Sequence, residues 1–302
     1  MIRIATRKSV LALWQANHVR ALLREAHADL EVELLPIVTE GDRIIDRPLA
    51  AIGGKGLFLK ELERALLDGE ADLAVHSMKD VPAVMTSGLI LDIVLPRANP
   101  FDALVSREYR LLSELPAGSR IGTSSLRRQS QLLALRPDLV VIDLRGNVDT
   151  RLRKLDEGQY DAIILACAGL QRLDLGARIT ETLQPPDWLP AATQGVIALQ
   201  CRQDDLETRA IIEPLAHSDT LVVATAERAV ARVLEASCQV PLAAYAVLEN
   251  GNVSMVARVS TPDGQENVQV DGQAPAAEAT ALGERIAADL LKFGAGKIIA
   301  DL

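Results

Sequence analysis

Basic side chains gather at three points where a short apolar segment gives way to a helical pattern. The three clusters are Arg7, Lys8 and Ser9; Ser124, Ser125, Arg127 and Arg128; and Arg145, Gly146, Asn147, Arg151, Arg153 and Lys154. Cations at a helix N-terminus are unfavourable unless an anion is bound there, because that end carries partial positive charge. Pairing with nearby Asp or Glu would account for one such junction. Three junctions at strand ends instead indicate a site for a polyanionic ligand bearing carboxylate or phosphate.

A fourth basic junction, Gly53-Gly54-Lys55-Gly56, precedes a helical pattern through Phe58, Leu62 and Ala65. It is not a phosphate-binding P-loop, because no Ser or Thr follows the lysine and the glycine spacing differs. A mobile lid and a simple tight turn both fit this segment.

One carboxylate lies at the end of an expected strand. The segment 71–75 runs into His76-Ser77-Met78-Lys79-Asp80-Val81-Pro82, and Pro82 disfavours helix at the residue before it. An Asp in this position commonly bonds its own backbone in a turn. The functional alternative is a carboxylate that faces the cations and stabilises a cationic intermediate, by about 4 kcal/mol at ~4 Å and an effective dielectric of ~20.

The three cysteines have different surroundings. Cys167 and Cys201 lie inside apolar segments, which predicts buried and unreactive thiols. Cys238 lies between a helical pattern and a strand, and an exposed loop thiol is a candidate nucleophile or point of covalent attachment. No His and Cys residues have zinc-binding spacing, so no metal site is expected.

Apolar segments alternate with helical patterns through the first two thirds of the chain. The expected strands are Ile2–Thr6, Val32–Val38, Ala71–Val75, Leu89–Leu95, Arg120–Thr123, Leu139–Leu144 and Asp161–Ala166. One helix face is marked by Ala12, Ala16, Val19, Leu23 and Ala26. This alternation predicts α/β layers with largely parallel sheets.

The last third of the chain has the pattern of a small α+β domain. A helix is expected over 221–235, and a hairpin joins 242–248 to 253–259 across Asn250-Gly251. A short strand at 268–270 and a closing helix complete the pattern. The proline-rich segments 96–100 and 184–190 are candidate hinges.

Composition excludes several classes of protein. The 302 residues are 49% hydrophobic and 24% charged, with a net charge of −9, which argues against wholesale nucleic-acid binding. No apolar run reaches the length of a membrane span, and the N-terminus leaves no room for a signal peptide. Three cysteines do not make a disulfide framework, so a reducing cytoplasm is expected.

Seven segments together resemble the porphobilinogen deaminase (hydroxymethylbilane synthase) family. They are Thr6–Gln15, Gly53–Leu59, Asp72–Pro82, Ile121–Gln129, Leu144–Arg153, Tyr160–Arg172 and Cys238–Pro241. They run from end to end of the chain in the expected order. The combination of HSMKDVP, GTSSLRRQ and LRGN is highly specific.

The resemblance implies a fold of two α/β domains similar to type II periplasmic binding proteins, plus a small C-terminal α+β domain. The expected domains are 1–96, completed by about 191–216; 97–190; and 217–302. The family's active site lies in the cleft between the first two domains, and the third presents Cys238. A monomer is expected.

The resemblance also implies the reaction. Four porphobilinogen molecules are joined head to tail with loss of ammonia, and hydrolysis releases linear hydroxymethylbilane. A dipyrromethane cofactor, assembled from the substrate and not turned over, is attached to Cys238 through a thioether. The family's catalytic carboxylate falls on Asp80, which assists proton transfer as the amine leaves and the azafulvene cation forms, and holds the pyrrole N–H groups.

Other site positions follow residue by residue from the family motifs. The cofactor-binding positions are Lys79, Asp80, Thr123, Ser125, Arg127, Arg128, Arg145 and Gly146, besides Cys238. The substrate-binding positions are Arg7, Ser9, Lys55, Phe58, Arg145, Asn147, Arg151, Arg172 and Gln194. The chain departs from the family pattern where Ala236, Ser237 and Thr193 replace the usual glycines and where Phe101 replaces Arg or His.

Two other functions remain open at this stage. A non-enzymatic receptor or effector domain could share the two-domain cleft, but it would not need Cys238. A phosphate-transfer enzyme using the Gly53–Gly56 segment would need a Ser or Thr and a metal-binding acidic motif, and neither is evident.

Overall fold

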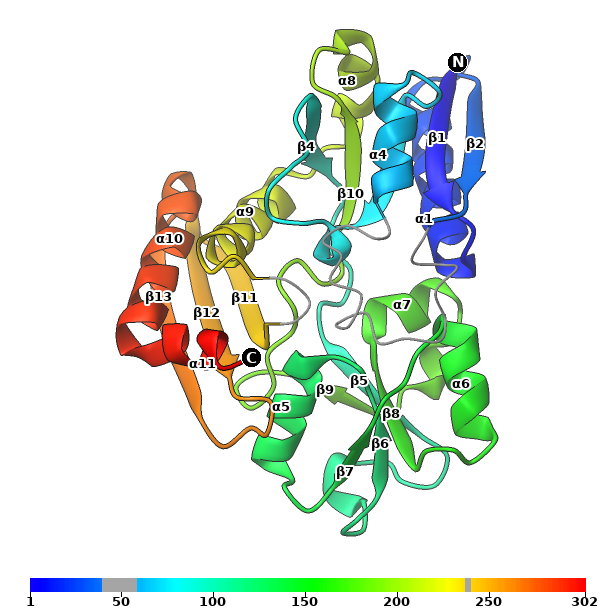
Figure 1. The fold of residues 1–302 in the computed structure, drawn as a ribbon. Helices are drawn as coiled ribbons and strands as arrows, with labels where there is room; N and C mark the ends of the chain where they lie inside the picture. The colour runs from blue at the N-terminus through cyan, green and yellow to red at the C-terminus, as the bar shows by residue number, and fades with distance from the viewer. Residues whose placement is uncertain (40–58, 237–239) are drawn as a thin grey trace. The chain divides into compact units, whose positions relative to one another are not determined.

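The computed structural model describes residues 1–39, 59–236 and 240–302, and the chain divides into two compact units (Figure 1). The first unit holds residues 1–98 and 196–221, and the second holds 99–195 and 222–302. The predicted positions Lys55, Phe58 and Cys238 lie outside the described residues.

A five-stranded sheet in the order β2-β1-β3-β10-β4 forms the centre of the first unit. Its strands are β1 (Ile2–Arg7), β2 (Val32–Ile37), β3 (Leu73–Ser77), β4 (Leu89–Val94) and β10 (Ile197–Arg202). β1 is parallel to β2 and β3, whereas β10 is antiparallel to both of its neighbours. The parallel strands β1 and β3 therefore end at the same sheet edge.

Two helices cover opposite faces of this sheet because successive strand residues point to opposite sides. Ile2 and Ile4 of β1 pack in one cluster with α1 (Val10–Ala26), as the four-three spacing predicts. Ala5 packs on the other side with α4 (Lys60–Leu67). Both clusters are buried, so each face of the sheet is closed from solvent.

The sheet of the second unit repeats this strand order, as β7-β6-β8-β5-β9. Its strands are β5 (Asp102–Ser106), β6 (Arg120–Gly122), β7 (Val140–Ile142), β8 (Ala162–Ala166) and β9 (Glu181–Leu183). Its helices are α5 (Leu126–Leu135), α6 (Val148–Asp156) and α7 (Cys167–Arg172). β6 is parallel to β7 and β8, and β5 is antiparallel to β8 and β9.

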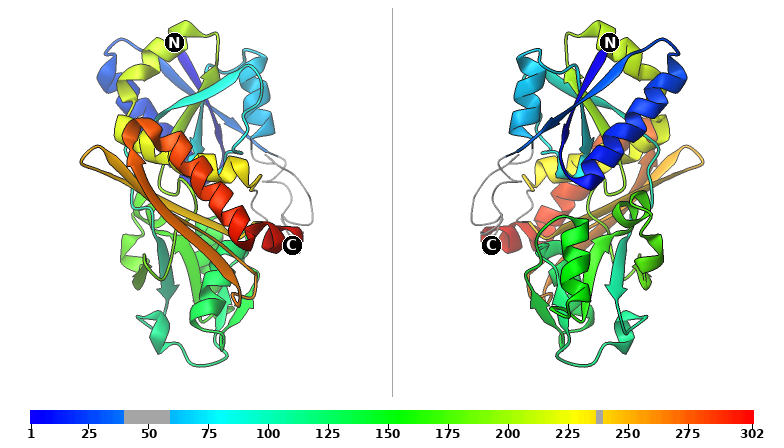
Figure 2. Two further views of the ribbon diagram at one scale, coloured as in Figure 1. Left: turned by 90° about the vertical axis from the view of Figure 1, so that its left-hand side faces the viewer. Right: turned by 90° about the vertical axis from the view of Figure 1, so that its right-hand side faces the viewer.

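The second unit also contains a three-stranded antiparallel sheet. It is formed by β11 (Leu242–Glu249), β12 (Asn252–Ser260) and β13 (Asn267–Pro275). It packs in one core with α9 (Ser218–Val233) and α10 (Ala279–Leu290), and α10 lies along one face of it (Figure 2). A short helix, α11 (Gly296–Ala300), follows. The α/β class with a small C-terminal α+β part is confirmed.

The expectation of largely parallel sheets is wrong, because each five-stranded sheet is mixed. β5, β9 and β10 were not among the expected strands, and β5 and β10 supply the antiparallel pairs. Parallel neighbours arise from βαβ crossovers. β5 and β10 instead enter their sheets after the chain has come from the other unit, so no crossover fixes their direction. In the described ranges, no helix is long and apolar enough to cross a bilayer.

Candidate active site

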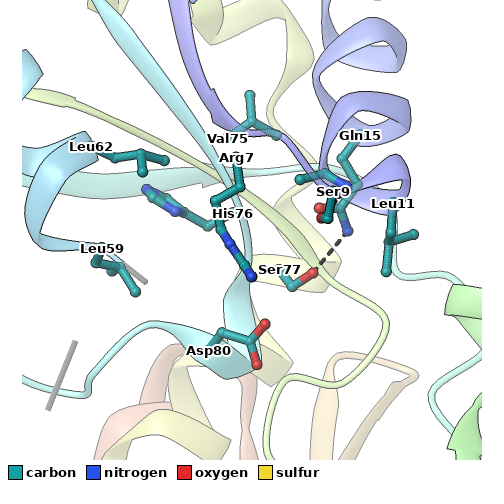
Figure 3. A pocket seen from close by; sticks show the side chains of 11 residues that line it. Arg7, Ser9, Leu11, Gln15, Leu59, Leu62, Val75, His76, Ser77 and Asp80 are labelled. Carbon is teal, nitrogen blue, oxygen red and sulfur yellow. Dashed lines mark hydrogen bonds between the residues drawn. The ribbon is translucent and has the colours of Figure 1, made fainter. Parts of the chain in front are cut away.

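A pocket in the first unit opens where β1 and β3 end (Figure 3). Its lining comes from β1, α1, β3 and the start of α4, and it consists of Arg7, Ser9, Leu11, Ala12, Gln15, Leu59, Leu62, Val75, His76, Ser77 and Asp80. The pocket therefore brings together three predicted site residues that are far apart in the sequence: Arg7, Ser9 and Asp80.

Asp80 is exposed at the end of a 3₁₀ turn, Met78–Asp80, that follows β3 directly. The Val81 N–H donates to the Met78 carbonyl at 3.1 Å, and Val81 is extended, as expected before Pro82. The Arg7 side chain extends toward the Asp80 carboxylate (Figure 3). An exposed carboxylate that lines a pocket can exchange a proton with a ligand and stabilise a cation there. Lys79 precedes Asp80 in the same turn and is half-buried.

Polar side chains fix the wall of the pocket opposite Asp80. Ser9 is the N-cap of α1, and its Oγ accepts the Ala12 N–H at 3.3 Å. The buried Gln15 donates its Nε2 to Ser77 Oγ at 2.9 Å and so ties α1 to the end of β3. These bonds hold Ser9 and Ser77 in place before any ligand arrives.

His76 has a structural role on the side of the pocket that α4 lines. Its Nε2 lies 2.8 Å from Gln200 Oε1, and Gln200 donates its own amide to Glu63 Oε1 at 2.9 Å. Since the Gln200 amide nitrogen donates to Glu63, Gln200 Oε1 accepts the hydrogen bond that the His76 Nε2–H donates. Burial lowers the pKa of His76, so the ring is neutral at pH 7.

A buried ionic cluster lies at the start of α5 in the second unit. Asp102 Oδ2 accepts Arg127 Nη1 at 2.8 Å, and Asp102 Oδ1 accepts Arg128 Nε at 3.1 Å and Nη2 at 2.7 Å. Trp188 Nε1 donates to Oδ2 at 2.8 Å and Gln194 Nε2 to Oδ1 at 3.0 Å. Burial disfavours the charged carboxylate, but the two guanidinium groups outweigh it and hold the pKa of Asp102 well below its usual range.

This cluster gives Arg127 and Arg128 a protein partner that the sequence motifs did not reveal. One carboxylate between two guanidinium groups still leaves one net positive charge at the N-terminus of α5. Asp102 lies on β5, 25 residues before Arg127 on α5, so no local pattern connects them. The sequence marks Asp102 only by its position, as a charged residue that begins the strand segment DALVS.

The N-termini of α5 and α6 have donors available for an anion. The caps Ser125 and Asn147 make no side-chain capping bond, in contrast to Ser9. Gly146 has a φ of 112°, and a Cβ there would lie 2.7 Å from Thr150 Cγ2, so the turn requires glycine. Arg145 Nη1 is buried and has no hydrogen-bond partner among the described residues. A buried guanidinium donor that lacks an acceptor fits an anionic ligand.

The other predicted residues of the second unit have partners within the protein. Thr123 Oγ1 accepts the Ser125 N–H at 3.2 Å, and Arg151 Nε donates to the Gly146 carbonyl at 2.7 Å. Arg172 Nη2, at the end of α7, donates to the Gly195 carbonyl at 2.7 Å. Burial lowers the pKa of Arg172 to about 10, so it remains a cation at pH 7. Gln194 is buried and also donates to the Pro100 carbonyl at 2.8 Å.

The predicted site residues thus fall into two sets, one in each unit. The first unit has Arg7, Ser9, Lys79 and Asp80, and the second has Thr123, Ser125, Arg127, Arg128, Arg145, Gly146, Asn147, Arg151, Arg172 and Gln194. The described parts of the chain hold no group of three or more His, Cys, Asp or Glu residues that could bind a metal ion.

Comparison with known families decides the assignment. Residues 2–210 match the family profile described as "Porphobilinogen deaminase, dipyromethane cofactor binding domain", and residues 221–292 match "Porphobilinogen deaminase, C-terminal domain". The chain belongs to the porphobilinogen deaminase family. Porphobilinogen deaminases from Xanthomonas axonopodis pv. citri (strain 306) and Xanthomonas euvesicatoria pv. vesicatoria (strain 85-10) are each 53% identical over 301 residues, covering 100% of this chain and 99% of the relative.

Two solved structures are also similar to this member of the porphobilinogen deaminase family. The methionine-binding protein MetQ is 13% identical with a TM-score of 0.45, covering 75% of this chain and 94% of its own. The periplasmic VFT2 domain of Bordetella pertussis BvgS is 18% identical with a TM-score of 0.42, covering 73% and 90%.

The dipyrromethane cofactor of the porphobilinogen deaminase family carries acetate and propionate groups, and the second unit suits them. Arg145 Nη1 lacks an acceptor among the described residues, two helix N-termini have uncapped donors, and the Asp102 cluster retains one positive charge. Each of these features is satisfied by a carboxylate.

Proposed function

We propose that this chain is a hydroxymethylbilane synthase in which Asp80 carries the chemistry and the basic helix N-termini of the second unit hold the carboxylates. The chain joins four porphobilinogen molecules head to tail with loss of ammonia and releases linear hydroxymethylbilane by hydrolysis. The observation that supports this best is the exposed Asp80 carboxylate in a pocket with Arg7 and Ser9.

Asp80 exchanges a proton with the amine that leaves from porphobilinogen and then stabilises the cation that remains. At ~4 Å and an effective dielectric of ~20, such a charge pair contributes about 4 kcal/mol before desolvation. Its two oxygens also accept hydrogen bonds from pyrrole N–H groups. Arg7, whose side chain extends toward Asp80, binds a substrate carboxylate.

Lys79, Thr123, Ser125, Arg127, Arg128, Arg145 and Gly146 would hold the dipyrromethane group, which Cys238 binds through a thioether. When bound, the group supplies the pyrrole carbon to which the first porphobilinogen is joined. The chain's own contribution is electrostatic: Arg145 Nη1 and the helix N-termini fix carboxylates, and Asp102 holds the two arginines at α5.

In this proposal the substrate's carboxylates are bound by Arg7, Ser9, Asn147, Arg151 and Arg172. Lys55, Phe58 and Gln194 are further substrate-binding positions. The chain acts as a monomer in the cytoplasm. Its three domains are 1–96 with about 191–216, 97–190, and 217–302; the separate cores of the three sheets support this division.

The test is to incubate the purified chain with porphobilinogen and to follow its consumption together with the appearance of hydroxymethylbilane. Roughly four porphobilinogen molecules should disappear for each product. A chain that binds porphobilinogen without consuming it would be a receptor or effector, and the proposal would be wrong.

A further inference from the structure

One turn in the second unit anchors two sets of predicted carboxylate-binding arginines. In residues 191–195, the Gln194 N–H donates to the Ala191 carbonyl at 3.0 Å. The Gln194 side chain donates to Asp102, which holds Arg127 and Arg128, and the Gly195 carbonyl accepts Arg172. The position of this turn therefore sets the position of three guanidinium groups.

The backbone of this turn is strained. Thr193 has a φ of 58° and Gly195 has a φ of 91°. A positive φ is unfavourable for a β-branched residue, so the turn relaxes unless other groups hold it. Thr193 is only 2% exposed, and the contacts that hold it come from the protein itself.

Glu227, on α9, is the group that holds Thr193. Its side chain is 0% exposed, and its carboxylate accepts the Thr193 N–H through Oε2 and the Ala246 N–H of β11 at 2.8 Å through Oε1. The Glu227 side chain thus contacts a turn 34 residues earlier in the chain and a strand 19 residues later.

We propose that Glu227 is a positioning residue for carboxylate binding. It acts through the Thr193–Gly195 turn on Arg172, a substrate-binding position, and on Asp102, which holds the cofactor-binding pair Arg127 and Arg128. This inference rests on the proposed roles of those arginines. Loss of the Glu227 carboxylate lets Thr193 leave its positive φ, and the turn then no longer holds Gln194 and the Gly195 carbonyl in place. Affinity for the carboxylates falls, whereas Asp80, in the other unit, is unaffected.

The decisive variant is Glu227→Gln, which keeps the size of the side chain but turns an NH₂ group toward one of the two backbone N–H donors. On holoenzyme, with cofactor content checked by intact mass, KM for porphobilinogen should rise about tenfold while kcat stays within about twofold. Adding Thr193→Gly to this variant should return KM to within about twofold of the unmodified chain, because glycine adopts a positive φ without strain.

Asp205→Asn is the matched control. Asp205 also accepts a backbone N–H, from Thr208 at 2.9 Å, but it lies in the first unit and caps α8 (Leu206–Ile212). It should lower the melting temperature and leave KM unchanged. If Glu227→Gln cannot be isolated folded, Glu227→Asp, which shortens the same carboxylate, should raise KM in the same direction and respond to the same rescue.

Three results would overturn the inference. Glu227→Gln could lower the melting temperature without changing KM, Asp205→Asn could raise KM as much as Glu227→Gln does, or Thr193→Gly could fail to restore KM. If the unmodified chain forms no product, the proposed function is wrong, but the positioning role of Glu227 is still testable. The Kd of porphobilinogen measured by calorimetry then replaces KM, and an unchanged Kd in Glu227→Gln overturns the positioning role.

Discussion

Asp80 and Asp102 differ in burial, and burial separates their roles. Asp80 is exposed in a pocket that a ligand can enter, so it can exchange protons. Asp102 is fully buried and its pKa is held well below the usual range, so it stays ionised and holds Arg127 and Arg128 in place. Sequence motifs pointed to Asp80. The role of Asp102 depends on a contact between β5 and α5 that no motif marks.

Asp80→Ala should lower kcat by roughly 10³-fold, because about 4 kcal/mol of charge stabilisation is removed. The exposed side chain leaves no cavity, so the melting temperature should stay within about 2 °C. Steady-state kinetics and a thermal melt check both expectations. Asp68→Asn, an exposed residue paired with Arg64 outside the pocket, is the control and should retain full activity. Near-normal turnover in Asp80→Ala would refute the catalytic role.

The thiols of Cys167 and Cys201 should resist alkylation in the folded protein. Both are buried, and burial raises the pKa of each to about 11. At pH 8 the thiolate fraction is then about one in a thousand, and it rises tenfold with each pH unit up to the pKa. Peptide mapping after brief iodoacetamide treatment measures this. If either cysteine is modified as rapidly as in the unfolded chain, its thiol is not buried and unreactive as expected.

The helix N-termini show what a sequence pattern can and cannot establish about an element. The basic residues at the N-termini of α5 and α6 were visible as a departure from the usual preference for acidic residues there. The direction of β5 and β10, and hence the mixed sheets, was not visible. A short buried strand has the same apolar composition in either direction, and its partner is fixed by long-range packing.

The site was predictable to a similar degree. Arg7, Ser9 and Asp80 converge because β1 and β3 are parallel neighbours, which alternation of strands and helices favours. The Asp102 cluster and the Glu227 contact join segments 25 and 34 residues apart, and these contacts depend on tertiary structure alone. Family motifs indicated Gln194 and Arg172 as site residues, but they did not indicate that the turn at 191–195 contacts Arg172 and Asp102.

Gly146→Ala should be more damaging than Gly118→Ala. Both glycines have positive φ, 112° and 81°, but only at Gly146 would a Cβ meet Thr150, at 2.7 Å, whereas Gly118 has nothing within 4 Å. The free energy of unfolding should fall by about 1 kcal/mol in Gly118→Ala, because of backbone strain. It should fall by about 2–4 kcal/mol in Gly146→Ala, where the Cβ also meets Thr150. Urea unfolding of both variants measures the difference.

Gly146→Ala should also reduce the fraction of protein that carries cofactor, because the turn presents Arg145 and the start of α6. Gly118→Ala should carry cofactor normally. Equal stability and equal cofactor content in the two variants would show that the turn at Gly146 is not part of the site.

The whole molecule carries a net charge of −9, yet its substrate is an anion. The local field at the site decides binding, since charges more than about 10 Å away are largely screened at ~0.1 M salt. In the proposed function, the arginines at β1, α5, α6 and α7 supply this local positive charge.

Salt should weaken substrate binding more than it slows the chemistry. Raising NaCl from about 0.05 M to about 0.5 M should increase KM for porphobilinogen several-fold, because ions screen the partly exposed arginines. The value of kcat should change by less than about twofold, since Asp80 acts at close range. Kinetics in a matched series of NaCl concentrations test this, and a KM that falls with salt would argue against carboxylate recognition by these cations.

The central claim is that the chain builds product on a covalent primer attached to Cys238, and intact mass tests it most directly. The purified chain should weigh more than its sequence by two porphobilinogen units less two ammonia molecules, and Cys238→Ser should show no excess. If the chain is isolated without the group, incubation with porphobilinogen should add this mass to the unmodified protein but not to Cys238→Ser. An unmodified mass that persists after incubation, or the same excess in Cys238→Ser, would contradict the account.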